Sequence, residues 1–336
     1  MIEYAAHLPE ARYCVITPFL VPPGAKRVNV GDGFILDSAT RLLGARPQAA
    51  FTSRAALGDA DIERINSSRA LVAMGANTLK DDFELTTGFS AETLARIKVP
   101  VILMGVGHYG VAEVTRGLTP ASQTLLRAFL ERFELMSVRC DASRRYVTDA
   151  LPDLADRIVM TSCPVVHAVD GVDRGFARKA EYEVLVVTIT DRAHVEAQLP
   201  LLQLAPRVLP ARRRILALHQ DYANRALWEQ ARALGYEVVR GERMGEFLDL
   251  YREADVHLGN RVHAHLKCLS LGAVSFCTPF DLRQQYFAES LDYPLVTRIP
   301  DAALESYDFA RVAARRNAAR AAMDRFTAQL RAVIAS

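Results

Sequence analysis

Short runs of apolar, often β-branched residues alternate along this chain with longer stretches in which apolar residues recur every three or four positions. This alternation is typical of βα units around a parallel sheet. In the first half it predicts strands at residues 13–17, 70–74, 101–105, 135–138 and 157–160. It predicts helices at residues 33–43, 91–97, 122–133 and 143–151. Five strands with helical crossovers make one doubly wound unit.

The pattern restarts after a polar, glycine-containing segment at residues 170–181, which we interpret as an interdomain linker between domains at 1–169 and 182–306. The second half predicts strands at residues 182–189, 214–218, 237–239, 256–258 and 274–277. It predicts helices at residues 222–234, 245–253 and 262–271. The expected fold class is therefore α/β, with two domains that each contain a parallel sheet.

Residues 307–336 are rich in alanine and arginine, and their apolar residues are spaced for one helical face. We expect a long C-terminal helix that packs on one or both domains. Its arginines could form a nucleic-acid or membrane face, but the interleaved residues are mostly alanine and no aromatic platform accompanies them. A solvated face is the better interpretation.

The amino-acid composition and the net charge argue against several classes of protein. The chain has 336 residues, of which 50% are hydrophobic and 24% charged, as in globular proteins. The chain has 41 basic and 39 acidic residues, so its net charge of +2 gives no global field for holding a polyanion, and we do not expect nucleic-acid binding as the main function. The N-terminus lacks the apolar core of a signal peptide, and no apolar run reaches the roughly 18 residues of a membrane span. We expect a cytoplasmic protein.

The five cysteines lack the spacing of a disulfide framework or a zinc site, so no metal is predicted and a reducing compartment fits. Cys14, Cys268 and Cys277 lie in apolar patterns and are expected in the core. Cys140 and Cys163 flank predicted loops, where a nucleophilic thiolate is conceivable, but the sequence places no histidine beside either.

Ligands of doubly wound proteins bind at the carboxyl ends of strands, so the loops there are the places to search. The loop at residues 22–33 contains Asn29, Gly31 and Asp32 before a helix, whose exposed backbone N–H groups suit an anion. Asn29 and Asp32 could equally be a turn residue and an N-cap. The neighbouring Lys26 and Arg27 favour an anionic ligand.

Three further loops follow predicted strands. Gly75 and Asn77 lie in one, and Gly107 and His108 lie in the next. Each alone is more typical of a structural turn, but two such loops at neighbouring strand ends suggest a close approach of the backbone to a substrate. Arg139 stands where a strand ends and a helix begins, as an ion-pair partner or as a ligand clamp.

The densest signal is the segment at residues 258–272, LGNRVHAHLKCLSLG. It predicts a strand end, a turn, and a helix that starts with Arg261 and His263. Arginine and histidine at a helix start suit an oxyanion or phosphate, and histidine suits proton transfer near neutral pH. His265 is expected to be half-exposed or paired. After the strand at 274–277, Arg283 is either a third cation or a solvated arginine beside a helix capped by Asp281.

In this order and spacing, the segments resemble the polysaccharide pyruvyl transferase family over about residues 28–287. The segments that carry the resemblance are NVGD at 29–32, MGAN at 74–77, GVG at 105–107, SVR at 137–139 with Ser143, SCP at 162–164, and GNRVHA at 259–264 with Gly272. The resemblance implies two Rossmann-like domains in a GT-B-like arrangement, with the active site in the interdomain cleft. It also implies transfer of the enolpyruvyl group of phosphoenolpyruvate to a sugar, normally as a cyclic ketal.

The same resemblance implies roles for single residues. Arg139, Arg261 and His263 would hold phosphoenolpyruvate and assist the chemistry, and Arg283 stands where the family often has a basic residue. Phosphoenolpyruvate is then a co-substrate, with no further cofactor. The acceptor would be a saccharide, free or lipid-linked, and a lipid-linked one would bring the protein to the inner face of the membrane.

This sequence departs from the family pattern at Ala76, Cys140 and His265. Because of these departures, the sequence does not identify the acceptor, and two alternative functions remain open. One is a GT-B glycosyltransferase that uses a nucleotide sugar. The other is an inert binding protein on the same fold.

The charges of phosphoenolpyruvate explain why these residue types are needed. A carboxylate and a phosphate require two or three cations plus backbone donors. Arg139, Arg261 and Arg283 could supply the cations. His263 would donate a proton to the methylene carbon or orient the phosphate, and Asp32 would act as a base toward the acceptor or order its loop.

Overall fold

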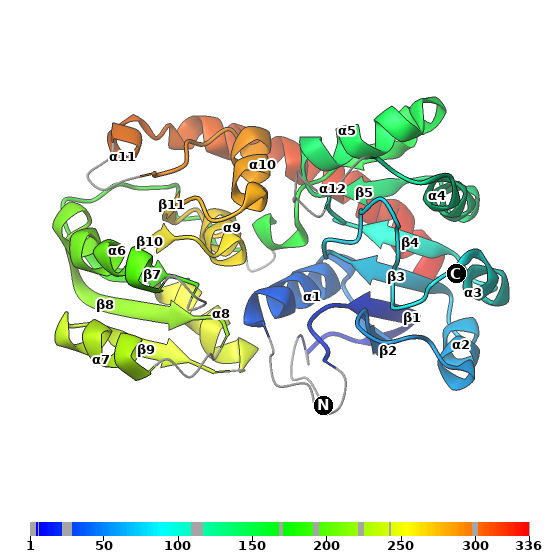
Figure 1. Cartoon of the computed structure of the whole chain (residues 1–336), viewed down its shortest axis with the longest axis horizontal. Helices are drawn as coiled ribbons and strands as arrows, with labels where there is room; N and C mark the ends of the chain where they lie inside the picture. Colours follow the sequence, from blue (N-terminus) through cyan, green and yellow to red (C-terminus); the bar gives the residue numbers. More distant parts are fainter. Residues whose placement is uncertain are drawn as a thin grey trace. The chain divides into compact units, whose positions relative to one another are not determined.

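The computed structural model describes residues 5, 7–21, 29–108, 117–167, 171–190, 195–220, 225–241, 243–297 and 302–335. The chain divides into two compact units. The N-terminal unit comprises Met1–Lys26, Ile35–Pro164 and Arg316–Ser336, and the C-terminal unit comprises Arg27–Phe34 and Val165–Arg315. Figure 1 shows both units coloured along the sequence.

The N-terminal unit is built on parallel strands. Its main sheet has the order β2-β1-β3-β4, with β1 at Glu10–Thr17, β2 at Arg46–Thr52, β3 at Ala70–Met74 and β4 at Val101–Met104. A second parallel pair, β5 (Met136–Val138) and β6 (Ile158–Met160), is joined to the end of β4 by a bridge between Val106 and Val138. All residues of β3 and β4 are buried, in keeping with the unbroken apolar runs of these parallel strands.

Helices of this unit lie between the strands along the chain. They are α1 (Val30–Leu43), α2 (Asp59–Asn66), α3 (Ala91–Arg96), α4 (Pro120–Arg132) and α5 (Asp141–Ala150), with short 3₁₀ segments at Pro152–Arg157 and Pro164–Val166. The start of α4 shows why helices begin where they do. Thr119 accepts a hydrogen bond from the N–H of Ser122, and Pro120 occupies the first helical turn, where no N–H is needed.

The C-terminal unit has one five-stranded parallel sheet with the order β11-β10-β7-β8-β9. The strands are β7 (Tyr182–Thr188), β8 (Ala211–Leu218), β9 (Glu237–Arg240), β10 (Val256–Gly259) and β11 (Val274–Cys277). The helices are α6 (Val195–Val208), α7 (Arg225–Ala233), α8 (Met244–Glu253), α9 (Val262–Ser270), α10 (Leu282–Leu291), α11 (Ala302–Ser306) and α12 (Phe309–Ala335). The chain leaves β7 toward β8 and later returns on its other side with β10. This reversal is a topological switch point, where doubly wound sheets bind ligands.

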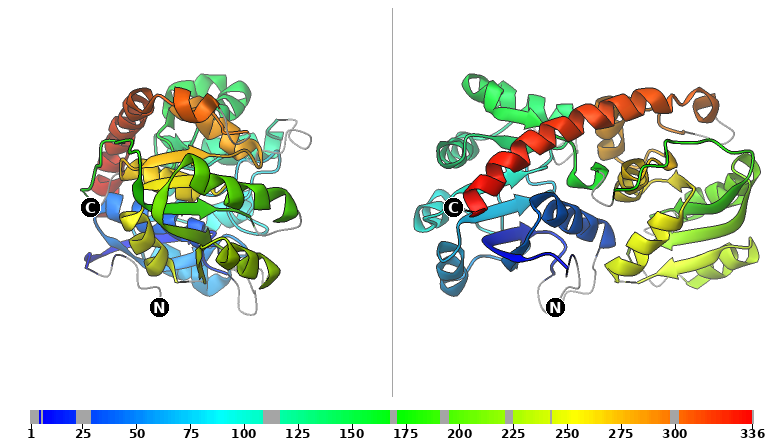
Figure 2. Two further views of the ribbon diagram at one scale, coloured as in Figure 1. Left: turned by 90° about the vertical axis from the view of Figure 1, so that its left-hand side faces the viewer. Right: turned by 180° about the vertical axis from the view of Figure 1, so that it is seen from behind.

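Helix α12 is shared by the two units, because its residues up to Arg315 belong to one and those from Arg316 onward to the other. In the N-terminal unit, the Phe326 ring packs edge-on against Phe133, and the Arg331 guanidinium donates to the carbonyl of Leu42. The right-hand view of Figure 2 shows this end of α12 running across one face of the unit's sheet. The long terminal helix is thus confirmed, although its Arg316 is buried and not solvated as predicted.

Most predicted strands and helices are present with ends shifted by one to three residues. The pattern did not predict β2, α2, α6 or α11, and it offered the start of α10 only as one of two alternatives at Asp281. The division into units differs from the predicted one, since it falls after Pro164 and not at a linker after residue 169. The first turn of α1 belongs to the C-terminal unit because Phe34 packs edge-on against His219 and Tyr251 there.

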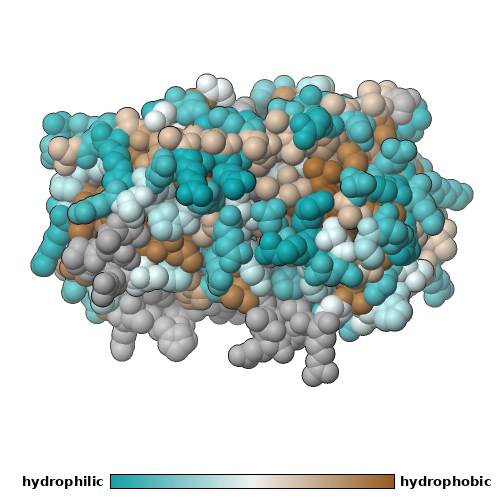
Figure 3. Space-filling view, turned by 90° about the horizontal axis from the view of Figure 1, so that it is seen from above, coloured by the Kyte–Doolittle hydropathy of each residue, from teal (hydrophilic) through white to brown (hydrophobic). Residues whose placement is uncertain are grey.

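Hydrophilic and apolar residues are mixed over the face drawn in Figure 3. Among the described residues, Val172 and Phe280 are the exposed large apolar ones. No helix within the described ranges combines the length and the hydropathy needed to cross a membrane.

Candidate functional site

The segment GNRVH lies at the switch point of the C-terminal unit. Gly259 ends β10 so close to β7 that a Cβ there would lie 2.0 Å from the Thr188 carbonyl oxygen. The next N–H, from Asn260, donates to that same carbonyl at 3.1 Å. Gln284 donates to the Asn260 carbonyl at 2.7 Å, and Thr190 donates to its side-chain oxygen at 3.2 Å. The turn that precedes α9 is therefore held from three sides.

Arg261 and His263 follow from this fixed turn. Arg261 is the N-cap residue of α9, and its guanidinium donates to Gln220 Oε1 at 3.3 Å and 3.4 Å, just beyond the end of β8. His263 stands in the first turn of α9, with 15% of its side chain exposed. Helix α9 thus presents a cation and an imidazole at its N-terminal end, where its dipole also favours an anion.

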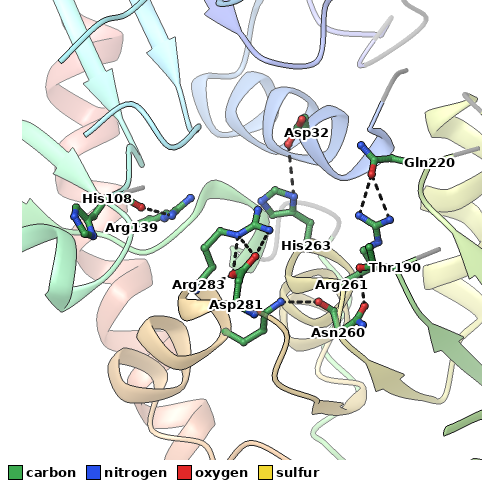
Figure 4. A network of polar contacts seen from close by, with 11 residues as sticks. Asp32, His108, Arg139, Thr190, Gln220, Asn260, Arg261, His263, Asp281 and Arg283 are labelled. Carbon is green, nitrogen blue, oxygen red and sulfur yellow. Dashed lines mark hydrogen bonds and ion pairs between the residues drawn. The ribbon is translucent and has the colours of Figure 1, made fainter. Parts of the chain in front are cut away.

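Asp32 meets His263 within the same unit, as Figure 4 shows. The distance from Asp32 Oδ1 to His263 Nδ1 is 4.0 Å, which permits an electrostatic contact but is too long for a hydrogen bond. Gly31 makes this approach possible, because a Cβ at this position would lie 2.8 Å from His263 Nδ1. Asp32, Gly31 and His263 therefore lie together at the start of α9.

Asn29 precedes α1 and organises its first turn. Its side-chain oxygen accepts from the Gly31 N–H at 3.2 Å, and its carbonyl accepts from the Asp32 N–H at 2.9 Å. Asn29 is thus the turn residue, whereas Asp32 lies inside the first turn and is not the N-cap. The predicted cations Lys26 and Arg27 lie outside the described residues.

The buried residues His219 and Tyr251 pack against Phe34 of α1. The Val30 N–H donates to the His219 carbonyl at 3.1 Å, which anchors α1 to the end of β8. His219 Nε2 and the Tyr251 hydroxyl are 2.6 Å apart. Burial lowers the pKa of His219 well below its ordinary value, and nearby Arg261 and His263 lower it further. His219 is therefore neutral near neutral pH and adds no charge beneath the site.

Arg283 is held by its own helix. The Asp281 side chain caps α10 by accepting from the Arg283 N–H at 2.9 Å, and it also accepts from the Arg283 guanidinium at 2.9 Å. The capped helix start is thus confirmed. Arg283 remains partly exposed, so an anion could still contact it.

A second group of predicted residues comes together in the N-terminal unit. The Gly107 N–H donates to the Ala76 carbonyl at 2.9 Å, which joins the loop after β3 to the loop after β4. The buried Arg139 guanidinium lies across Gly107, where a Cβ would collide with it, and donates to the His108 carbonyl at 2.8 Å. Figure 4 draws this Arg139–His108 contact.

The surroundings of His108 fix its charge. The backbone N–H of His108 donates to the Ser143 hydroxyl at 2.9 Å. The centroid of the His108 ring lies 4.3 Å from that of the Tyr146 ring. Burial lowers the pKa of His108, nearby Arg139 lowers it further, and Asp81 opposes both. His108 is thus expected to be neutral and to contribute hydrogen bonds.

Backbone strain marks the loops of this group. Gly75, Ala76 and Gly105 all have positive φ, and Gly75 leaves room for Ile35, whose side chain a Cβ would meet at 2.7 Å. Asn77 follows this strained turn. Ser162, after β6, has a φ of 62° although it is not glycine, and it is fully buried. Non-glycine residues with positive φ cluster at functional sites, so we add Ser162 and Ala76 to the candidate positions.

Several functional candidates were missed by sequence reasoning. They are Gln220, Tyr251, Thr188 and His219. Gln220 lies two residues after the predicted strand at 214–218, and Thr188 lies one residue before the end of the predicted strand at 182–189, so a search of the residues around strand ends would have found both. His265 is fully buried and paired with Ser275, so the half-exposed alternative was wrong.

All five cysteines are buried. Burial raises the pKa of Cys268 to about 12 and the pKa of Cys277 further, so both are thiols at neutral pH. Cys140 Sγ lies 2.9 Å from the Ser143 hydroxyl.

The family model described as polysaccharide pyruvyl transferase matches residues 29–279, a range that begins at the Asn29 loop and contains Asp32, Arg139, Arg261 and His263. The chain belongs to this family. It is therefore a transferase of a polysaccharide-modifying family, in which a small-molecule donor reacts with a saccharide acceptor. No curated protein matches the sequence.

Solved structures share the fold at low identity. A protein from Listeria monocytogenes described as a UDP-N-acetylglucosamine 2-epimerase is 9% identical over 94% of this chain and 91% of its own, with a TM-score of 0.52. The UDP-GlcNAc 2-epimerase of Neisseria meningitidis, bound to UDP-GlcNAc, is 13% identical over 88% of both chains, with a TM-score of 0.50. The wall teichoic acid polymerase TagF is 12% identical over 97% of this chain and 88% of its own, with a TM-score of 0.48. The two epimerase structures, with TM-scores of 0.52 and 0.50, support a GT-B-like fold with two Rossmann-like units.

Proposed function

We propose that this protein transfers the pyruvyl group of phosphoenolpyruvate to a sugar of a cell-surface glycan or its precursor, as a ketal. The observation that carries the proposal is the contact of Asp32 with His263 beside Arg261, inside the segment that the family model matches. A cation and an imidazole at the start of α9, with a carboxylate from the first turn of α1 beside them, are the groups that this reaction needs.

His263 would donate a proton to the methylene carbon of phosphoenolpyruvate. The neighbouring carbon then becomes electron-poor, and an acceptor hydroxyl attacks it and loses its proton. Phosphate leaves, and a second hydroxyl attacks the same carbon and loses its proton, which closes the ketal. The Asp32 carboxylate lies close enough to attract a protonated His263 ring and to hold it toward the donor.

The arginines would bind the two charges of the donor. Arg261 is anchored through Gln220, so its guanidinium is preorganised for a phosphate or carboxylate oxygen. Asn29, Gly31 and Arg283 would add substrate contacts within the C-terminal unit. In the N-terminal unit, the Arg139 guanidinium lies beside the backbone groups of Gly107 and His108, near Gly75 and Asn77, and would also bind an anion.

The deciding experiment measures phosphate release from phosphoenolpyruvate with a panel of saccharide acceptors, and detects the ketal by mass spectrometry. Replacing His263 by Ala should lower kcat about 100- to 10,000-fold, as expected for a lost general acid. His7→Ala, at an exposed position, is the matched control and should keep the wild-type rate. A His263→Ala variant as active as the control would remove His263 from the mechanism.

Donor binding is tested separately by thermal stabilisation, since any ligand of the native state must raise the Tm. Phosphoenolpyruvate should stabilise the wild type but not Arg261→Ala, while the exposed Arg243→Ala control should respond like the wild type. Stabilisation by UDP, GDP or their sugars alone would overturn the donor assignment and favour a glycosyltransferase.

A further inference from the structure

A row of buried polar side chains lies beneath the start of α9. Thr188 from β7, His257 from β10, Ser275 from β11 and His265 from α9 have no solvent exposure. Buried polar groups destabilise a fold unless they are hydrogen-bonded, and apolar side chains would fill the same space without that requirement. Four such groups in one place suggest a role beyond packing.

These groups form one continuous chain of hydrogen bonds. The Arg261 N–H donates to Thr188 Oγ1 at 3.4 Å, and that oxygen lies 2.8 Å from His257 Nε2. On the other side of the ring, His257 Nδ1 lies 2.8 Å from Ser275 Oγ. Ser275 Oγ in turn lies 2.7 Å from His265 Nδ1. This chain of hydrogen bonds thus begins at Arg261 and ends at His265, and His263 lies between these two residues at the start of α9.

The protonation states determine which group donates and which accepts in each hydrogen bond of this chain. Burial lowers the pKa of His257 to about 3 and that of His265 well below its ordinary value, so each ring is neutral and carries one N–H. Thr188 accepts from Arg261, so its hydroxyl is available to donate to His257 Nε2. His257 Nδ1–H then donates to Ser275, whose hydroxyl donates to His265 Nδ1. In the reverse order the Thr188 hydroxyl has no acceptor within the chain.

This ordering leaves the His265 proton on Nε2. That nitrogen makes no hydrogen bond with any described residue, and the ring lies 4.5 Å from the Tyr293 ring, measured between centroids. An N–H beside an aromatic ring is partly compensated by a weak interaction with the ring face. The last residue of this hydrogen-bond chain, His265, therefore packs against the aromatic ring of Tyr293.

We propose that His257 and Ser275 are positioning residues, which hold Arg261 and His263 in place through both ends of the first turn of α9. This inference rests on the proposed function, in which Arg261 and His263 contact the donor. A displacement of about 1 Å at reacting groups can lower a rate about 100-fold, so a device that fixes this turn would matter for turnover.

The first test compares two fully buried serines of the C-terminal unit. Ser275→Ala breaks the chain of hydrogen bonds between the two histidines, whereas Ser270→Ala removes a hydroxyl whose bond is to the Lys267 carbonyl of its own helix, at 2.7 Å. We expect kcat with phosphoenolpyruvate to fall at least about tenfold in Ser275→Ala and less than about twofold in Ser270→Ala. Ser275→Thr, which keeps the hydroxyl, should recover most of the rate. Equal rates for the two alanine variants would overturn the proposal.

The second test does not depend on the reaction. In ¹⁵N-histidine NMR spectra, His257 should carry its proton on Nδ1 and His265 on Nε2. Ser275→Ala should mix these tautomers and shift the His263 ring signals, while Ser270→Ala should leave both unchanged. Unshifted His263 signals in Ser275→Ala would overturn the positioning role. Failure of the wild type to use phosphoenolpyruvate would instead count against the proposed function alone.

Discussion

At Gly31 a hydrogen stands where any other residue would carry a Cβ, and that Cβ would lie 2.8 Å from His263 Nδ1. Gly31→Ala should therefore push the imidazole away from its place while improving the helix propensity of α1 by about 0.5–1 kcal/mol. We expect kcat to fall about tenfold or more with unchanged or higher stability, measured by turnover and thermal unfolding.

Gly245 provides the matched control for this substitution. It also lies in the first turn of a helix, and a Cβ there would meet nothing within 4 Å. Gly245→Ala should keep full activity. Full activity in Gly31→Ala would show that the close approach of Gly31 to His263 has no part in turnover.

At the scale of one element, α10 depends on the Asp281 carboxylate for both its cap and the placement of Arg283. Asp281→Ala removes both and should lower the free energy of unfolding by about 1 kcal/mol. Asp281→Asn keeps a capping oxygen and loses only the ion pair, so its stability should stay close to wild type. Urea unfolding of the two variants measures the difference, and an equal loss in both would contradict the capping role.

The elements that the sequence predicted and missed differ in their apolar patterns. β3 is a five-residue run with every residue buried, so its apolar pattern is unbroken. β2 is an edge strand with every residue only partly buried, and its sequence RPQAAFT has neither an apolar run nor an alternation. The edge strand β9 is also incompletely buried but was predicted, because its sequence EVVR contains two adjacent valines, so the apolar run and not the position in the sheet decides whether local pattern finds a strand.

The candidate site was predictable for a similar reason. Parallel strands end at one edge of a sheet, so reading the loops after strands was enough to place Arg261, His263 and Arg139. The contact of Asp32 with His263 was not predictable, because it requires the first turn of α1 to pack against the second sheet through Phe34. Nothing in the spacing of apolar residues specifies which of two similar units a helix end joins.

At the scale of the whole molecule, the buried histidines make the C-terminal unit sensitive to acid. Burial lowers the pKa of His257 to about 3, whereas unfolded histidine titrates near 6.5. Below pH 6.5 the unfolded chain therefore binds more protons than the folded one, and stability present above pH 6.5 is lost as the pH falls. The loss should be about 1.4 kcal/mol per pH unit for His257 alone, with His219 and His265 adding to it.

Urea unfolding at pH 7.5 and pH 5.5, followed by tryptophan fluorescence, measures this effect. The chain has one tryptophan, Trp228 of α7, and its ring lies 3.8 Å below the Arg240 guanidinium within the C-terminal unit. The midpoint should fall at the lower pH. A midpoint that is constant or higher at pH 5.5 would mean that these histidines are not neutral in the folded state.

The sharing of α12 between units gives the last prediction. Phe309 near its start stacks on Phe176 in the C-terminal unit, and Phe326 near its end packs on Phe133 in the N-terminal unit. Either Phe→Ala change should cost about 3–5 kcal/mol, but in different units. Phe309→Ala should lower the Trp228 fluorescence midpoint. Phe326→Ala should leave that midpoint unchanged while the circular dichroism transition begins at lower urea. If both variants shifted the two signals together, the units would unfold as one, and the two packing sites on α12 would not belong to separately stable cores.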